Sequence, residues 1–421
     1  MAAKRSKSTK ILTLILMILA LNTIYQLPYL MYYYYTPLQE AMGLVGRDAD
    51  YGRLLNVYGI ANVILYLPGG WIADKFSAKK LLVFSMVGTG VLGLWEATFP
   101  SYELLMVIFV LFAVTTVLTF WSSSVKCVNL LADDGEQGGM FGSLEAGRSV
   151  LGLIITTLFV SIFTFMAGSS SAMPVIITTC SIMMIVVGIL LAILMPADNS
   201  SHATNASFGQ SMLAFGKAFK HPATYLMAGM IFAASLVGAS ASYYAPYLEK
   251  VIGMSTSITV PFASYRGPLC GLIGASLGAV MATKMGRSSK PIIFAGIIMA
   301  ACFGGMVIMP ATAAVMWPML IIMIIASLCY SVFRALYYAT MDESGVPKNM
   351  VGSVVGIASL LGFLPDTFYT SMAGGWLEQY GNGGFKRIFM ACIAASVLGL
   401  VCAFISDRKI RAHQASIAAA K

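Results

Sequence analysis

The stretch Tyr34-Tyr-Thr-Pro-Leu-Gln-Glu40 returns 209 residues later as Tyr243-Tyr-Ala-Pro-Tyr-Leu-Glu249. Two more pairs of segments match at nearly the same offset: Tyr58-Gly59 with Arg266-Gly267, and Gly142-Ser143 with Gly352-Ser353. Three matches in the same order, spaced by about half of a 421-residue chain, indicate an internal duplication. The chain is therefore predicted to consist of two related halves.

The composition decides the environment of these halves. Apolar residues make up 58% of the chain and charged residues 10%, with a mean hydropathy of +0.83. Soluble domains carry roughly 25% charged residues, so this chain cannot cover a water-facing surface. The composition excludes an ordinary cytosolic enzyme, a nucleic-acid-binding protein and a disordered chain.

Runs of about 20 apolar residues, the length that crosses the hydrocarbon core of a bilayer, recur along the sequence. The twelve predicted membrane-spanning helices cover 11–35, 51–73, 80–99, 103–131, 139–166, 172–195, 222–248, 257–283, 291–310, 313–341, 350–376 and 384–406. Strands of a membrane barrel would be near 10 residues long with alternating hydrophobicity, which these runs are not. The predicted fold is an all-α membrane protein.

Each half receives six of these helices. We predict an N-terminal six-helix bundle over 1–195, a cytoplasmic linker over 196–221 and a C-terminal six-helix bundle over 222–421. Because six is even, both bundles would have the same orientation, related by a pseudo-two-fold axis along the membrane normal. Parallel repeats of this kind occur in secondary transporters, with the solute path between the halves near the midplane.

The distribution of Lys and Arg predicts the orientation. With both termini inside, seventeen Lys and Arg fall on the inner side and five on the outer side. Cytoplasmic loops carry such an excess, so we predict cytoplasmic termini in a bacterial inner membrane. The same excess of Lys and Arg on the inner side accounts for the formal charge of +9. The expected partner is therefore the lipid bilayer and not a nucleic acid.

The loop after the second helix carries a recognisable motif, Gly70-Trp-Ile-Ala-Asp74-Lys75-Phe-Ser-Ala-Lys79-Lys80. It resembles the signature loop of the major facilitator superfamily, although Ser77 and Ala78 replace the usual Gly and Arg. The resemblance covers all twelve helices, with an organic-anion branch as the expected subgroup. It implies that Gly70, Asp74, Lys75 and Lys79 form a cytoplasmic latch that stabilises the outward-open state. The alternative is that the basic residues only anchor the loop to the membrane surface.

Six charged residues fall well inside the predicted helices, more than three residues from either end, where a charge costs at least about 2.5–3.5 kcal/mol. Four are basic and two are acidic: Lys126, Arg148, Arg266 and Arg334, with Glu145 and Asp366. This surplus of cations predicts a positive central cavity. The forked guanidinium groups of Arg148 and Arg266, one from each half, are suited to a carboxylate, phosphate or sulfonate. The alternative is that each Arg is neutralised within the protein and only holds helices together.

The two acids are candidates for proton coupling. Glu145 lies three residues before Arg148 on one helix, so the pair either form an intrahelical contact or link proton binding to solute binding. Asp366 follows Pro365, which is expected to loosen its helix, and it could pair with Arg266 or Arg334. Lys126 and Arg334 lie at a similar depth in two helices that correspond in the repeat. They are predicted to form an inner gate or a second anion contact. The alternative is that their long side chains reach the inner membrane surface.

Tyrosines are frequent in the first helix of each half. Tyr29 and Tyr33 share a helical face with Tyr25 and Tyr32, and Tyr243 begins the matching run of the second half. Their hydroxyl groups would bind a polar solute if the face lines the cavity, as first helices do in the family resembled. The alternative is an aromatic belt at the membrane interface.

No residue set for catalysis or for a cofactor is recognisable. The three His lie in loops or the tail, the seven Cys form no paired motif, and there is no phosphate-binding Gly-rich loop. We therefore expect neither a metal nor an enzyme. The predicted function is a monomeric secondary transporter of a small organic anion, driven by protons or by exchange with a counter-substrate. The alternatives are a carrier of neutral polar solutes such as sugars, and a transporter-like receptor that binds without transport.

Overall fold

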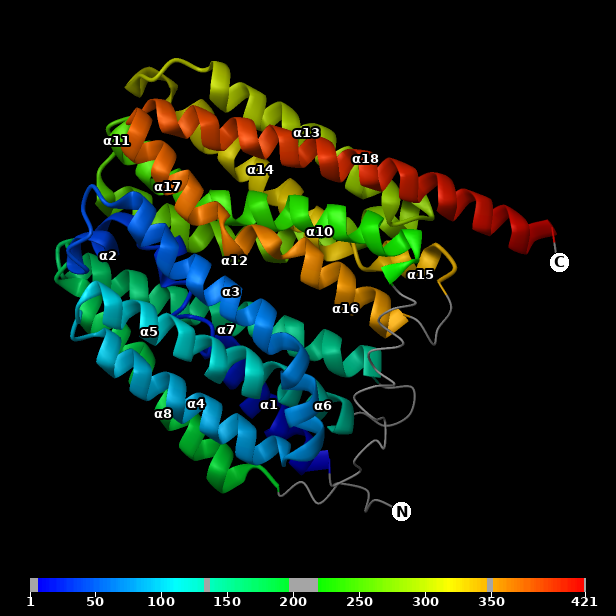
Figure 1. The fold of residues 1–421 in the computed structure, drawn as a ribbon, viewed down its shortest axis with the longest axis horizontal. Helices are drawn as coiled ribbons and strands as arrows, with labels where there is room; N and C mark the ends of the chain where they lie inside the picture. The colour runs from blue at the N-terminus through cyan, green and yellow to red at the C-terminus, as the bar shows by residue number, and fades with distance from the viewer. Residues whose placement is uncertain (1–6, 132–136, 197–218, 347–350, 420–421) are drawn as a thin grey trace. The chain divides into compact units, whose positions relative to one another are not determined.

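The computed structural model describes residues 7–131, 137–196, 219–346 and 351–419, and the regular structure within these ranges is entirely helical (Figure 1). The chain divides into two compact units. Unit 1 comprises Met1–Val45 and Val57–Asn205, and unit 2 comprises Gly46–Asn56 and Ala206–Lys421. The linker boundaries at 195 and 222 stay a prediction, because most of 196–221 lies outside the described ranges.

Unit 1 contains the first six membrane passes, each a stretch that crosses the membrane once. Its helices are α1 (Lys7–Thr23), η1 (Leu30–Tyr32), α2 (Tyr35–Ala41), α3 (Asp48–Lys75), α4 (Ala78–Glu96), α5 (Tyr102–Ala113), η2 (Val114–Trp121), α6 (Ser122–Leu131), α7 (Gln137–Phe165) and α8 (Ala172–Leu194). Gly46–Asn56, which includes the beginning of α3, belongs to unit 2 by its contacts.

Unit 2 contains the other six passes. Its helices are α10 (Pro222–Ser240), η3 (Ala241–Tyr243), α11 (Tyr244–Lys250), α12 (Thr256–Met285), α13 (Ser289–Ile308), η4 (Ala313–Val315), α14 (Met316–Leu336), α15 (Ala339–Glu343), α16 (Val351–Gly362), η5 (Leu364–Thr367), α17 (Tyr369–Tyr380) and α18 (Gly383–Ala419). Within the described residues of both units, nine helices are long and apolar enough to cross a membrane. The twelve-pass architecture predicted from the sequence is consistent with this arrangement.

The first pass of each half is interrupted before its Tyr-Tyr-x-Pro motif continues as a helix, over 24–34 in unit 1 and over 241–243 in unit 2. The prediction of a continuous helix over 11–35 was wrong, because α1 ends at Thr23 and turns lead to η1 and α2. Pro28 has no backbone N–H and disfavours helical geometry at the residue before it, which explains the interruption. Tyr34 directly precedes α2 as Tyr243 directly precedes α11, and both side chains are buried. The local structure thus confirms the duplication.

The eleventh pass is broken as Pro365 predicts. The α-helix α16 ends at Gly362, the short 3₁₀-helix η5 contains Pro365 and Asp366, and α17 begins at Tyr369. The fourth pass is irregular in a way that the sequence did not indicate. Its middle, η2, is a π-helix, a form that is rare and is frequently found at functional sites.

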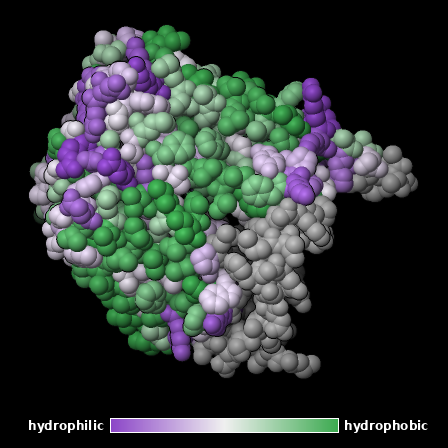
Figure 2. Space-filling view, viewed as in Figure 1, coloured by the Kyte–Doolittle hydropathy of each residue, from purple (hydrophilic) through white to green (hydrophobic). Residues whose placement is uncertain are grey.

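Close helix pairs build each unit, as α4 with α8 in unit 1 and α13 with α18 in unit 2 (Figure 1). Gly90 permits the first pair to approach, since a Cβ there would lie 2.7 Å from the Ser181 carbonyl oxygen. Large apolar side chains remain outside these interfaces, and Figure 2 shows hydrophobic residues over much of the visible surface. In water they would be costly, but in a bilayer they face lipid chains.

The beginning of α3 packs on α17 inside unit 2. The Thr370 hydroxyl donates to the Gly52 carbonyl oxygen at 2.8 Å and bonds to the Asn56 side chain. The Ala49 N–H donates to the Glu378 carboxylate at 2.8 Å. A Cβ on Gly374 would overlap the Asp48 carbonyl oxygen, so the two backbones are in direct contact.

Candidate functional site

A cluster of tyrosines forms around the interrupted first pass of unit 1. The ring of Tyr29 lies 6.4 Å from that of Tyr25, 5.4 Å from that of Tyr32 and 5.7 Å from that of Tyr58 on α3. Tyr29 thus lies in a cluster of four tyrosines, and its role in a cavity wall stays a prediction. Tyr33 is half-buried directly after η1, and its substrate role stays a prediction.

Arg148 on α7 lies beside this cluster. The Asn22 side-chain amide donates to the Arg148 carbonyl oxygen, which ties α1 to α7. Tyr25 is within electrostatic range of Arg148, and also of Tyr58 and Tyr66. The interrupted first pass therefore places phenol hydroxyl groups near a membrane-embedded guanidinium, a combination that can bind an anion and neutral hydroxyl groups together.

The π-helix adds an indole to the same part of unit 1. The Trp121 Nε1–H at its end donates to the Tyr66 hydroxyl on α3 at 3.2 Å, and Tyr66 is 43% exposed. Phe120, the preceding residue, packs its ring edge-on against Tyr25 at 6.2 Å. Two flat aromatic faces joined by a hydrogen bond offer a surface on which a ring-shaped solute could stack.

Hydroxyl groups fix the position of η2. Thr116 bonds to the Tyr58 hydroxyl at 2.9 Å, Thr115 to Thr89 at 2.8 Å, and Thr119 to Ser85 at 2.6 Å. Each of these contacts is buried. They compensate for the weaker backbone bonding of the π-helix and keep Trp121 in place.

Lys126, predicted as a gate or anion contact, donates its Nζ to the Ala73 carbonyl oxygen at 2.8 Å. Ala73 lies in the last turn of α3, where carbonyl groups have no partner within the helix and a cation is favourable. In this structure Lys126 therefore caps α3, and its binding role stays a prediction.

Arg266 on α12 is held by neutral groups of unit 2. Its guanidinium donates to the Ser327 hydroxyl at 2.8 Å and to the Ala241 carbonyl oxygen at 3.4 Å, and it lies 4.9 Å from the centre of the Tyr244 ring. Among the described residues no group accepts a hydrogen bond from its buried Nε. The guanidinium is thus held in position by neutral groups and keeps hydrogen-bonding capacity for an anion.

Asp366 receives a hydrogen bond of 2.6 Å from the Ser235 hydroxyl on α10 and feels the charge of Arg334. Of the two partners predicted for Asp366, the electrostatic one observed is Arg334. Arg334 itself is exposed at the end of α14. An acid in the broken part of a pass, held by a hydroxyl group and near a cation, is placed well for proton exchange.

Tyr243 is buried among the helices of unit 2. Its side chain is 1% exposed, and its hydroxyl donates to the Thr370 carbonyl oxygen at 2.7 Å. The contact joins η3 to α17, so the residue packs two passes together. Its substrate role stays a prediction.

The predicted latch is only partly described. Lys79 donates to the Met195 carbonyl oxygen at 2.5 Å, and the Lys75 Nζ lies 4.8 Å from the Trp71 ring centre. A Cβ on Gly70 would meet no atom within 4 Å. The side chains of Asp74 and Glu145 lie outside the described residues, so the latch and the proposed Glu145–Arg148 contact stay predictions.

A polar network that was not predicted from the sequence joins the beginning of α13 to the C-terminal part of α18. Asp407 accepts from the Ser289 hydroxyl at 2.7 Å and from Arg411, and it lies 3.5 Å from Arg287. The spacing of Asp407 and Arg411 on one helix was the available signal. The network ties the loop between α12 and α13 to the last pass.

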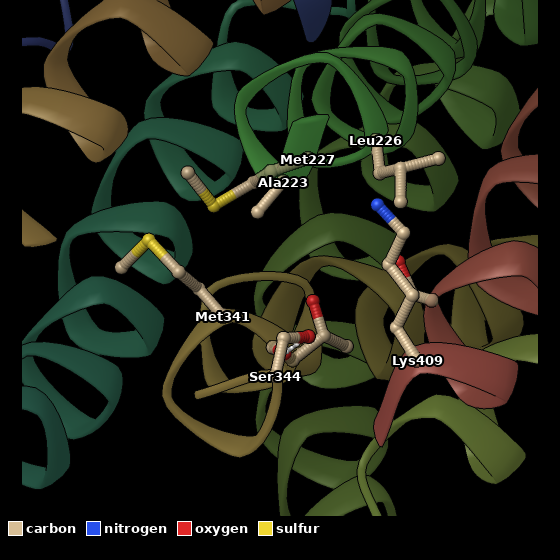
Figure 3. A pocket seen from close by; sticks show the side chains of 8 residues that line it. Ala223, Leu226, Met227, Met341, Ser344 and Lys409 are labelled. Atoms are coloured by element: carbon tan, nitrogen blue, oxygen red, sulfur yellow. Dashed lines mark hydrogen bonds between the residues drawn. The ribbon is translucent and has the colours of Figure 1, made fainter. Parts of the chain in front are cut away.

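A small hollow nearby is lined by α10, α15 and α18. Figure 3 shows Met227 and Met341 on one of its sides and the Lys409 amine near Leu226 on the other. None of the predicted site residues lines it.

Comparisons with known proteins give the family of this sequence. A model of the Major Facilitator Superfamily matches residues 11–370. Inner membrane protein YqcE of Escherichia coli is 30% identical over 403 residues, which cover 92% of each chain. Inner membrane protein YihN of the same species is 24% identical over 410 residues, which cover 95% of this chain and 96% of that protein.

Solved structures of similar fold are transporters. The nucleoside transporter NupG has a TM-score of 0.69 at 14% identity, covering 94% of this chain and 98% of that chain. A bacterial homolog of the human lysosomal transporter Spinster, inward-facing and unoccupied, has a TM-score of 0.67 at 14% identity, covering 97% and 98%. At these identities the likeness concerns the fold.

Proposed function

Because this chain belongs to the major facilitator superfamily, and is therefore an integral membrane transporter and not an enzyme, we propose that it moves a small organic anion by alternating access. The anionic group is a carboxylate, phosphate or sulfonate. The observation that carries the proposal is Arg266, whose guanidinium is held in position by the neutral side chains of Ser327 and Tyr244. In unit 1, Arg148 beside Tyr25 provides the second cation for the anionic group.

Three probes with the same ring separate an anion carrier from a sugar carrier. Purified protein is reconstituted in liposomes, and thermal stabilisation and exchange are measured with glucose, glucuronate and glucose 6-phosphate. We expect stabilisation and exchange with at least one of the charged probes and little with glucose. Binding of glucose as tight as that of both charged probes would contradict the anion proposal.

Neutral ring-shaped solutes are the second candidate. The hydrogen-bonded Trp121–Tyr66 pair and the hydroxyl groups of Tyr25 and Tyr29 favour it, since they suit stacking and sugar-like hydroxyl groups. NupG, a nucleoside transporter by name, shares the fold. Preference for glucose in the same assay selects this candidate, and binding of any probe without exchange selects a non-transporting receptor.

For energy coupling we propose a proton or an exchanged counter-substrate, with Asp366 in the central role. Asp366→Asn is expected to abolish accumulation against a gradient and to leave exchange at equal concentrations nearly unchanged, because exchange does not require the proton to leave. The assay compares both modes in liposomes with and without an imposed pH gradient. Asp50→Asn, on the first turn of α3 and paired with Arg47 and Arg53, is the control. Accumulation retained in Asp366→Asn would place coupling elsewhere.

We place the protein in a bacterial inner membrane with cytoplasmic termini, as the names of both relatives and the Lys and Arg distribution support. A reporter that fluoresces only in the cytoplasm, fused after Lys421, tests the orientation. Absence of fluorescence from a stably inserted fusion would show that the C-terminus lies on the outer side and contradict the proposed orientation.

A further inference from the structure

Glu96, the last residue of α4, is a buried acid that the proposed mechanism does not use. Its side chain is 0% exposed, and neither carboxyl oxygen has a hydrogen-bond partner among the described residues. Glu96 was not among the predicted site residues because it lies near the predicted end of the 80–99 segment. A buried polar group without a partner calls for an explanation.

The surroundings of Glu96 disfavour an ionised carboxylate. On α8, the helix that packs most closely on α4, the titratable side chain within electrostatic range is the neutral thiol of Cys180. No cation of the described chain acts on Glu96, and the next acid along the chain, Glu103 on α5, is exposed. The C-terminal end of a helix also repels a negative charge. Burial of an unpaired carboxylate is far more costly than burial of its neutral form.

The first pass connects this acid to the tyrosine cluster. A Cβ on Gly93, one turn before Glu96, would overlap the Leu27 side chain, so Leu27 lies directly on this part of α4. Leu27 belongs to the non-helical turn over 24–29, and the same turn carries Tyr25 and Tyr29. Movement of this turn would therefore uncover the region of Glu96 and displace the two tyrosines at once.

We propose that Glu96 is a proton-binding site of unit 1, occupied while the 24–29 turn packs on α4 and emptied when that turn moves away. The ligand is a proton, taken from water and returned to it as the carboxyl group is buried or hydrated. Because one turn carries both Leu27 and the tyrosines, proton binding at Glu96 and the geometry of the tyrosine cluster are linked. This inference goes beyond the proposed function and holds whichever solute is carried.

The protonated carboxyl group is tested first, in the full-length protein in liposomes without any solute. The infrared difference spectrum between wild type and Glu96→Gln at neutral pH is expected to contain the C=O stretching band of a protonated carboxyl group without a strong hydrogen bond. Glu103→Gln, which removes an exposed acid on the neighbouring helix, should give no such band. A difference spectrum with only carboxylate bands for Glu96 would overturn the proposal.

The link to the turn is tested by hydrogen exchange of residues 24–29 as a function of pH. If opening releases one proton, the opening constant rises about tenfold per pH unit, in addition to the similar rise of intrinsic exchange. We expect wild type and Glu103→Gln to show both contributions and Glu96→Gln to show only the intrinsic one. Equal pH dependence in wild type and Glu96→Gln would overturn the link. Wild type alone must show the additional pH dependence, so the proposal can be contradicted even if a variant folds poorly.

Discussion

Arg266→Lys is expected to weaken binding of an anionic solute by about 10- to 150-fold, the equivalent of one hydrogen bond to a charged group of about 1.5–3 kcal/mol. The lysine keeps the positive charge but loses the planar fork and the stacking on Tyr244. It also cannot contact Ser327 and Ala241 while presenting a further N–H group in the guanidinium geometry. The measurement is the affinity for whichever charged probe binds wild type, by titration of the purified protein.

The matched control is Arg387→Lys. Arg387 also lies over a tyrosine ring, that of Tyr380, with 3.3 Å between its guanidinium carbon and the ring centre, but it is at the beginning of α18. Its replacement should leave solute affinity within about twofold, because surface charges of this kind contribute little. Arg148→Lys tests the cation of unit 1 by the same titration. Near-normal affinity in both the Arg266 and Arg148 variants would rule out guanidinium binding of the solute.

Gly374→Val is expected to release the beginning of α3 from α17. The new Cβ would overlap the Asp48 carbonyl oxygen, and a backbone atom cannot move aside as a flexible side chain can. Strain from such overpacking is typically about 1–3 kcal/mol, which raises the opening of the contact roughly 5- to 150-fold. The contacts of Ala49 with Glu378 and of Thr370 with Gly52 should be lost with it. Hydrogen exchange of residues 46–56 measures the effect.

The neighbouring Gly375 is the control for this variant. A Cβ there would meet no atom within 4 Å, while its place in α17 gives the same change in helix propensity. Gly375→Val should therefore keep the protection of residues 46–56. Equal exchange of these residues in both variants would show that the backbone contact does not hold α3 in place.

The fold was predictable from the sequence because two physical signals were strong. Apolar runs of membrane length determine where helices cross, and the repeated Tyr-Tyr-x-Pro motif recurs at matching breaks in the two halves. The interruption of the first pass was missed although Pro28 lies in it, because proline is tolerated in many membrane helices and hydropathy does not register a break. The loosening at Pro365 was predicted from the proline itself, which was considered because Asp366 follows it in an apolar run.

The sequence could indicate candidates for the site by residue type but not their contacts. Rarity of charge in a membrane made Arg148, Arg266 and Asp366 candidates. Their neutral partners, such as Ser327 for Arg266, are common residues without a pattern. Tyr58 had a signal that was available, since it occupies the repeat position of Arg266. Glu96 had the same signal, a charge in an apolar run, but it lies close to the end of the predicted 80–99 segment, and its isolation results from packing between α4 and α8.

The π-helix η2 has a consequence for the evolution of this chain. A π turn is equivalent to an α-helix that has gained one residue, because its hydrogen bonds run from i to i+5. Because the extra residue is taken up within the wider turn, deletion of one residue within 114–120 would restore ordinary α-helix and leave Trp121 beside Tyr66 and Lys126 at the end of α3. The same deletion in the α-helical part of this pass, α5, would instead rotate everything after it by about 100°. A relative that is one residue shorter at η2 can therefore keep this wall of unit 1, whereas a change of length in α5 would alter it.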